Sequence, residues 1–220
     1  MFQQIFNPEN GFFSGISKFM DIVGLSVAWL VFCLPVVTIG PATAALYYSV
    51  VKCVRRGEGH PYRNFWRSFH ANWKMGGLLT LLCLPVGAFL CWEHRMLRIL
   101  ASGGDRVLLG AYFAMTVLLL LPIGFLCWLF PLLSRFESSL GGLLWSAFLL
   151  TFRYLPITIV LALLLFLSAT ATAALWFFLP FTVTPAVTVL LASFLVERVL
   201  KKCTPGRAFR EDEEKPWYLK

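Results

Sequence analysis

A long uncharged run near the C-terminus constrains the fold more than any other feature of this sequence. Residues 154–196 include no Asp, Glu, Lys or Arg. As a helix rising 1.5 Å per residue, such a run is about 65 Å long, twice the ~30 Å hydrocarbon core of a bilayer. It therefore predicts two membrane spans, at 157–179 and 181–199, with a tight reversal at Pro180.

The rest of the chain has the same character. Hydrophobic residues make up 59% of the 220 residues and charged residues only 14%, whereas soluble domains carry about 25% charged residues. Mean hydropathy is +0.76. Further spans are predicted at 19–39, 75–92 and 107–130. The expected fold is an all-α polytopic membrane helical bundle of about five transmembrane helices. One transmembrane domain covers 1–200, and a mobile cytoplasmic tail covers 201–220.

The first uncharged region contains candidate helix breakers. Pro35, Gly40 and Pro41 interrupt residues 22–51, and such residues predict a kink or a broken helix. Residues 42–54 are expected to continue as a short helix that is too short to be an independent span. If this region instead crosses the membrane twice, the N-terminus moves to the inner side.

A basic, aromatic-rich segment separates the first two spans. Its apolar residues recur at helical spacing, opposite a polar and basic face, which predicts an amphipathic helix over 62–74 in the headgroup region. This helix either serves only as a lipid anchor or also docks a partner. The candidate contact residues are Arg63, Phe65, Trp66, Arg67, Phe69 and Trp73.

A second interfacial helix is predicted by an internal match at an offset of 79 residues. This offset places Trp66 on Trp145 and Lys74 on Arg153, within loops that each lead into a span. The pattern indicates a parallel repeat of the kind found in transporters, although two unrelated interfacial helices can also resemble each other. Arg135, Glu137 and Trp145 join the candidate partner or lipid contacts, with Arg135 expected beside Glu137.

The distribution of charge predicts the topology. The net charge is +8, but 15 of the 19 Lys and Arg residues lie in or next to the two interfacial loops and the C-terminal tail. The positive-inside rule places these three regions in the cytoplasm. With five spans, the N-terminus lies outside and the C-terminus inside. Because the cations flank apolar runs, topology explains the basic balance better than nucleic-acid binding does.

No motif for catalysis, metal binding or cofactor binding is present. The three histidines are scattered, and the six cysteines form no CxxC pair. We therefore expect no enzyme activity, no metal and no cofactor. Glu197 is expected at a span end, so proton-coupled transport through a buried carboxylate is disfavoured. Thr182, Thr184 and Thr188 line either a polar path or a helix-packing face.

Three segments carry a resemblance to a known family. They are LPVVTIGPATAALYYSVVKCVRRGEGH (34–60), RNFWRSFHANWK (63–74) and PLLSRFESSL (131–140). Together they resemble the YesL family of bacterial membrane proteins of unknown function. That resemblance implies a plasma-membrane protein encoded near sugar-uptake ABC importers and sensor kinases.

The expected function follows from this association. We expect an accessory or scaffold protein of a carbohydrate ABC importer, with the lipid bilayer and importer permease or ATPase subunits as partners. The spacing of Glu137 from Leu155-Pro156 is similar to that of the ATPase-docking EAA loop of importer permeases, but serines replace its alanines. The alternative is a small-solute transporter or channel built on the parallel repeat. The oligomeric state is left open.

Overall fold

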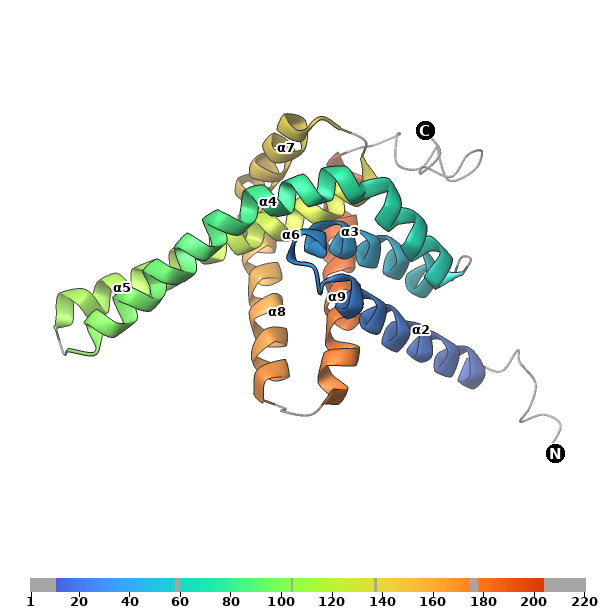
Figure 1. Cartoon of the computed structure of the whole chain (residues 1–220), viewed down its shortest axis with the longest axis horizontal. Helices are drawn as coiled ribbons and strands as arrows, with labels where there is room; N and C mark the ends of the chain where they lie inside the picture. The colour runs from blue at the N-terminus through green and yellow to red at the C-terminus, as the bar shows by residue number, and fades with distance from the viewer. Residues whose placement is uncertain (1–10, 58–59, 104, 137, 175–177, 204–220) are drawn as a thin grey trace.

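The computed structural model describes residues 11–57, 60–103, 105–136, 138–174 and 178–203 (Figure 1). Within these ranges helices are the only regular secondary structure, joined by short turns and irregular segments. The helices are α2 (Gly11–Phe32), α3 (Ile39–Ser49), α4 (Pro61–Ala101), α5 (Arg106–Leu118), α6 (Leu120–Arg135), α7 (Leu140–Arg153), α8 (Leu155–Ala174) and α9 (Phe178–Cys203). Six helical segments are long and apolar enough to cross a membrane. The expected all-α membrane bundle is confirmed.

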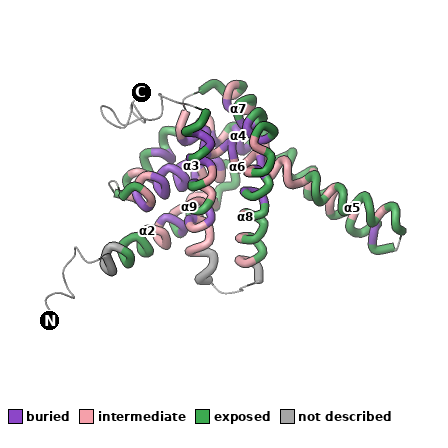
Figure 2. The backbone as a smooth tube through the Cα atoms, turned by 180° about the vertical axis from the view of Figure 1, so that it is seen from behind, coloured by how far each residue is buried: buried purple, intermediate pink, exposed green. Residues whose placement is uncertain are grey.

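A buried helical segment lies at the centre of the bundle. It consists of a 3₁₀ turn, η1 (Val36–Thr38), then α3, then a π-helical turn, η2 (Val50–Arg55). Side chains such as Leu46 and Val50 are fully enclosed by α2, α4, α6 and α9. In Figure 2 this segment is purple, whereas the outer helices are largely green.

The central segment corrects one prediction. Residues 42–54 were predicted to be too short to span, but the segment Val36–Arg55 has 20 residues and meets the length of a span. Pro41 lies in the first turn of α3, where a backbone N–H has no helical partner to lose. It therefore does not interrupt the helix. The break lies earlier, where α2 ends at Phe32 and Pro35 precedes η1.

Helix α4 corrects a second prediction. The interfacial helix at 62–74, the span at 75–92 and most of the polar connection after it form one continuous helix of 41 residues. No proline lies between Pro61 and Pro85, so the helix continues through the predicted boundary at Lys74 and Met75. The chain reverses only after Ala101, and the second half of α4 together with α5 forms an arm that points away from α8 and α9 (Figure 1). Helices α5 and α6 meet at Leu119, because Pro122 cannot donate to the carbonyl of Leu118.

Glycines allow α3 and α4 to pack backbone against backbone. A Cβ atom added to Gly76 would lie 2.8 Å from the backbone nitrogen of Pro41, and one added to Gly40 would lie 2.4 Å from the carbonyl oxygen of Gly76. Thr80 closes this contact. Its hydroxyl accepts from the Gly40 N–H at 2.9 Å and donates to the Gly76 carbonyl at 2.8 Å. Small residues at such crossings are typical of membrane helices.

Helices α8 and α9 form an antiparallel pair (Figure 1). The predicted boundaries at 179 and 181 are wrong, because α8 ends at Ala174 and α9 begins at Phe178. Pro180 lies within the first turn of α9, a position that proline tolerates. Helix α9 continues to Cys203, so residues 201–203 of the expected tail are helical. The remainder of the tail lies outside the described residues.

Candidate functional site

Helix α7 presents an exposed row of aromatic side chains. Ser139 caps its N-terminus by accepting from the Gly142 N–H at 3.3 Å. Trp145, Phe148 and Phe152 are all exposed, and Trp145 exposes 66% of its surface. Their rings form a chain, with centroids 6.0 Å apart and then 4.7 Å apart. The opposite face of the helix packs against α6 and α8, so the aromatic row is not required for the core.

The first half of α4 divides its aromatic residues between the core and the surface. Phe65 and Phe69 are buried and contact Phe32 of α2, with ring centroids 5.6 and 4.8 Å apart. Trp66 and Trp73 remain about half exposed. Of the candidate contact residues on α4, therefore, the two phenylalanines lie in the core and the two tryptophans on the surface. Arg63 and Arg67 are exposed on the same helix.

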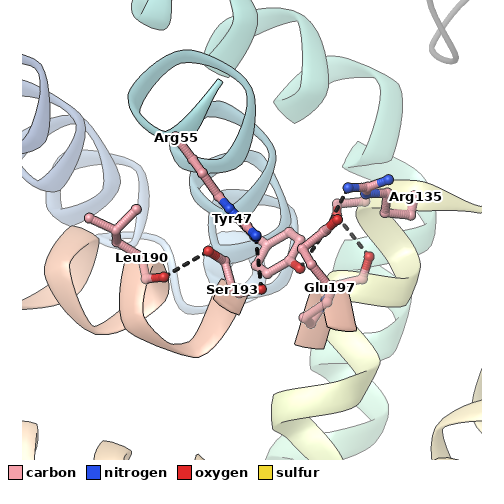
Figure 3. A network of polar contacts seen from close by, with 8 residues as sticks. Tyr47, Arg55, Arg135, Leu190, Ser193 and Glu197 are labelled. Carbon is pink, nitrogen blue, oxygen red and sulfur yellow. Dashed lines mark hydrogen bonds and ion pairs between the residues drawn. The ribbon is translucent and has the colours of Figure 1, made fainter. Parts of the chain in front are cut away.

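Arg135 and Glu197 form a buried ion pair that joins the ends of α6 and α9 (Figure 3). The Arg135 guanidinium donates to Glu197 Oε1 at 2.5 Å, and the Tyr47 hydroxyl of α3 donates to the same oxygen at 3.0 Å. Glu197 is only 3% exposed. A buried carboxylate is tolerated when it has a cation and hydrogen bonds as partners. This cluster therefore ties three helices together.

This pairing bears on two predictions. Arg135 was expected beside Glu137, which lies outside the described residues; within them Arg135 pairs with Glu197. Glu197 was expected at a span end, and it does lie close to the C-terminal end of α9, but its side chain is enclosed within the protein. A buried carboxylate is therefore present in the bundle, contrary to the expectation that disfavoured proton coupling. The only sequence signal was one acidic residue close to the end of an apolar run.

Arg55, in the π-helical turn η2, contacts α9 close to the ion pair. Its guanidinium donates to the Ser193 carbonyl at 3.1 Å and lies 4.6 Å from the ring centroid of Phe194 (Figure 3). Ser193 in turn donates to the Leu190 carbonyl at 2.7 Å. Glu197 lies one helical turn after Ser193 in α9. The basic end of the central segment is therefore fixed to α9 by both polar and cation–π contacts.

The junction of α7 and α8 is also held to the end of α9. The Tyr154 hydroxyl lies 3.4 Å from the Cys203 Sγ. Hydrogen bonding with this sulfur raises the pKa of the Tyr154 hydroxyl above its ordinary value. Both residues lie at the ends of helices, so this contact links the α7–α8 junction to the C-terminal end of α9.

Two of the three threonines that were predicted to line a polar path or a packing face lie at a cavity. Thr184 and Thr188 line a cavity of about 390 Å³ between α2, α3, α8 and α9, whereas Thr182 is not among its lining residues. As for metals, no three His, Cys, Asp or Glu side chains of the described ranges lie close enough to hold an ion together.

The two predicted repeat units differ in the structure. The first is continuous with the following span as α4, whereas α7 is separated from α8 by Tyr154. Trp66 and Trp145 are both exposed, but Phe69 is buried where its counterpart Phe148 is exposed. The same offset of 79 residues aligns Glu58 with Glu137, and both lie outside the described residues.

Six apolar helical segments, one of which is the buried central segment Val36–Arg55, define a multi-pass α-helical membrane protein. The family described as "Protein of unknown function, DUF624" matches residues 22–93, which extend from α2 into α4. "Uncharacterized protein YesL" of Bacillus subtilis (strain 168) is 24% identical over 166 residues, which cover 74% of this chain and 75% of that protein. These two findings support a YesL-like family for the chain. No solved structure gives a significant match.

Proposed function

We propose that the chain is an integral membrane accessory or scaffold protein associated with a carbohydrate (oligosaccharide) ABC uptake system of the bacterial plasma membrane. The observation that carries this proposal is the exposed aromatic row of α7. At about 21 Å for its 14 residues, this helix is too short to cross a ~30 Å hydrocarbon core. It therefore suits a position at the membrane surface, within reach of another protein. The proposal includes no catalytic role.

The chemistry of this surface suits a protein partner. Trp145, Phe148 and Phe152 are exposed beside Arg153 at the end of α7, and aromatic and arginine side chains dominate the energetics of many protein interfaces. The exposed Trp66 and Arg67 of α4 are a second set of the same kind. Association with an importer is supported by the gene neighbourhood that the family resemblance implies, which is an association and not a chemical argument.

The orientation belongs to the same proposal. The positive-inside rule places the η2–α4 loop, α7 and the C-terminus in the cytoplasm. The expected outer N-terminus requires that residues 1–54 cross only once. If both α2 and the segment Val36–Arg55 cross, the three basic regions stay inside and the N-terminus joins them. The presence of six candidate spans favours this second arrangement.

The test is co-purification from native membranes in a mild detergent. Tagged wild-type protein is expected to recover an importer permease with its ATPase. The double variant Trp145→Ala/Phe152→Ala is expected to lower that recovery about tenfold or more, because anchor residues contribute 2 kcal/mol or more each. The matched control is Trp92→Ala/Phe113→Ala, which removes equally exposed aromatic residues from the α4–α5 arm.

Two results would contradict the proposal. One is recovery of the wild-type protein alone under conditions that keep known membrane complexes intact. The other is equal loss of partner in both double variants, since that would reflect a general loss of apolar surface. Membrane insertion is expected to survive in both variants, because the spans drive it.

One observation favours the alternative function of a small-solute transporter or channel. Thr184 and Thr188, which sequence analysis places on a possible polar path, do line a cavity. A water-filled path predicts that Thr184→Cys and Thr188→Cys react with a water-soluble maleimide in intact membranes. Complete protection of both positions would exclude such a path.

A further inference from the structure

The cavity between α2, α3, α8 and α9 is lined by hydroxyl groups on otherwise apolar walls. One wall carries hydroxyl groups from Ser168 and Thr172 of α8 and from Thr184 and Thr188 of α9, and the opposite wall carries Trp29 of α2 and Thr43 of α3. Thr172 and Thr184 face each other, with their hydroxyl oxygens 3.1 Å apart. The remaining lining residues are apolar, and none is charged. The volume of about 390 Å³ lies within the range of small-molecule sites.

Most of these hydroxyl groups already donate to backbone carbonyls, as Ser168 does to the Leu165 carbonyl at 2.8 Å. Thr188 donates to the Thr184 carbonyl at 2.7 Å, and Thr172 donates to the Ser168 carbonyl at 2.6 Å. On the opposite wall Thr43 donates to the Ile39 carbonyl at 2.7 Å and accepts from the Trp29 indole N–H at 3.2 Å. A hydroxyl group has two acceptor lone pairs besides its donor. The cavity therefore offers hydrogen-bond acceptors on apolar walls.

The cavity opens toward the hydrocarbon region. Leu165 and Ala169 lie on its α8 wall and are themselves exposed. Helix α8 has no charged residue along its length, and neighbouring side chains such as Phe166 and Leu167 are exposed apolar groups. A molecule that reaches this opening from the bilayer arrives with its apolar part already solvated by lipid.

From this chemistry we propose that the cavity binds an uncharged amphiphile that carries a hydroxyl group. Its apolar body lies against the apolar walls, and its O–H donates to a hydroxyl oxygen of Ser168, Thr172, Thr184 or Thr188. An ion or a zwitterionic headgroup has no charged partner there, and burying an unpaired charge is costly. A sugar has many polar groups that apolar walls leave unsatisfied. This site is independent of the proposed association with an importer.

The test uses two photoreactive probes on the purified protein in phosphatidylcholine nanodiscs. One is a hexadecyl alcohol that carries a diazirine, and the other is the matching alkane without the hydroxyl group. The alcohol is expected to label peptides from 165–172 and 184–189 saturably, and unlabelled hexadecanol should compete. The alkane should bind about threefold to tenfold more weakly, which is the value of one net hydrogen bond.

Variants locate the site. Ala169→Phe fills the cavity and is expected to abolish saturable labelling, whereas Leu167→Phe adds bulk to a side chain that is 70% exposed on the same helix and should not. Thr188→Val should remove the preference for the alcohol over the alkane, and Thr188→Ser should keep it. Because Thr188→Ser retains the hydroxyl group, it separates loss of an acceptor from loss of packing.

Three results would overturn the proposal. Equal labelling by the two probes would remove the role of the hydroxyl groups. Labelling that does not saturate, spread over the outer faces of the helices, would indicate bulk lipid. Full reaction of Thr188→Cys with a water-soluble maleimide would show a water-filled path instead. None of these results bears on co-purification with an importer, so the two proposals fail separately.

Discussion

Two adjacent glycines of α4 have opposite roles at the scale of the residue. Gly76 faces the backbone of Pro41, whereas a Cβ atom on Gly77 would lie 3.6 Å from a Val37 methyl group and 3.8 Å from the Val37 carbonyl oxygen, both ordinary contacts. We expect Gly76→Ala to lower the free energy of unfolding by about 1–3 kcal/mol, as overpacking does. Gly77→Ala should be neutral or stabilise by up to about 1 kcal/mol, because glycine weakens helices.

Thermal unfolding of the two variants in detergent checks this contact. The same size of change is made one position apart, so differences in helix propensity cancel. Equal melting temperatures for the two variants would contradict the close approach of α3 and α4.

The ion pair gives a second prediction at this scale. Replacing Glu197 by Gln leaves the Arg135 guanidinium without its anion, and breaking a buried pair costs about 3–5 kcal/mol. Because the Arg135 side chain is 15% exposed, we expect the lower end of that range. Tyr47→Phe removes one hydrogen bond to the carboxylate and should cost about 1.5–3 kcal/mol.

A double variant separates charge from packing at the same place. Arg135→Met/Glu197→Leu leaves no buried charge and should be more stable in detergent than Glu197→Gln alone. If the double variant is the less stable of the two, the cluster stabilises the fold through more than charge compensation.

At the scale of the element, the first half of α4 has one buried face and one exposed face. Phe69 is 3% exposed and Trp66 is 52% exposed, three residues apart. We expect Phe69→Ala to cost about 3–5 kcal/mol of stability, as for a large core side chain. Trp66→Ala should cost much less, because its ring is only partly buried.

Melting temperatures in one detergent measure this difference, with Phe65→Ala as the comparison for a second buried ring. A similar loss from Trp66→Ala and Phe69→Ala would mean that the whole aromatic face packs inside. In that case the first half of α4 would offer no aromatic surface to a partner.

At the scale of the whole molecule, the number of crossings decides where the N-terminus lies. The basic regions around Arg56 and after Arg198 belong on one side under either arrangement. With six crossings, reporter fusions at both termini should report the cytoplasm, and a fusion between α4 and α5 should report the outside. An external N-terminus with an internal C-terminus would restore five crossings and make residues 36–55 a buried, non-spanning segment.

Much of this protein follows from its sequence alone. Hydropathy is a local quantity that accumulates along a run, so the membrane class, the all-helical fold and most of the spans are readable without coordinates. The break near Pro35 and a helix over 140–153 also have local causes. The family resemblance rests on the segments 34–60, 63–74 and 131–140, and the first of these includes the buried central segment Val36–Arg55.

Tertiary packing alone decided the rest. Arg135 and Glu197 are 62 positions apart, and no local sequence pattern predicts that these two side chains form an ion pair. Helical spacing placed Phe65, Phe69 and Trp66 on one face, but the packing of α2 and the central segment against α4 determines which of these rings is buried. The cavity likewise exists because four helices meet without filling the space between them. These features depend on contacts between distant segments, which a pattern along one helix does not encode.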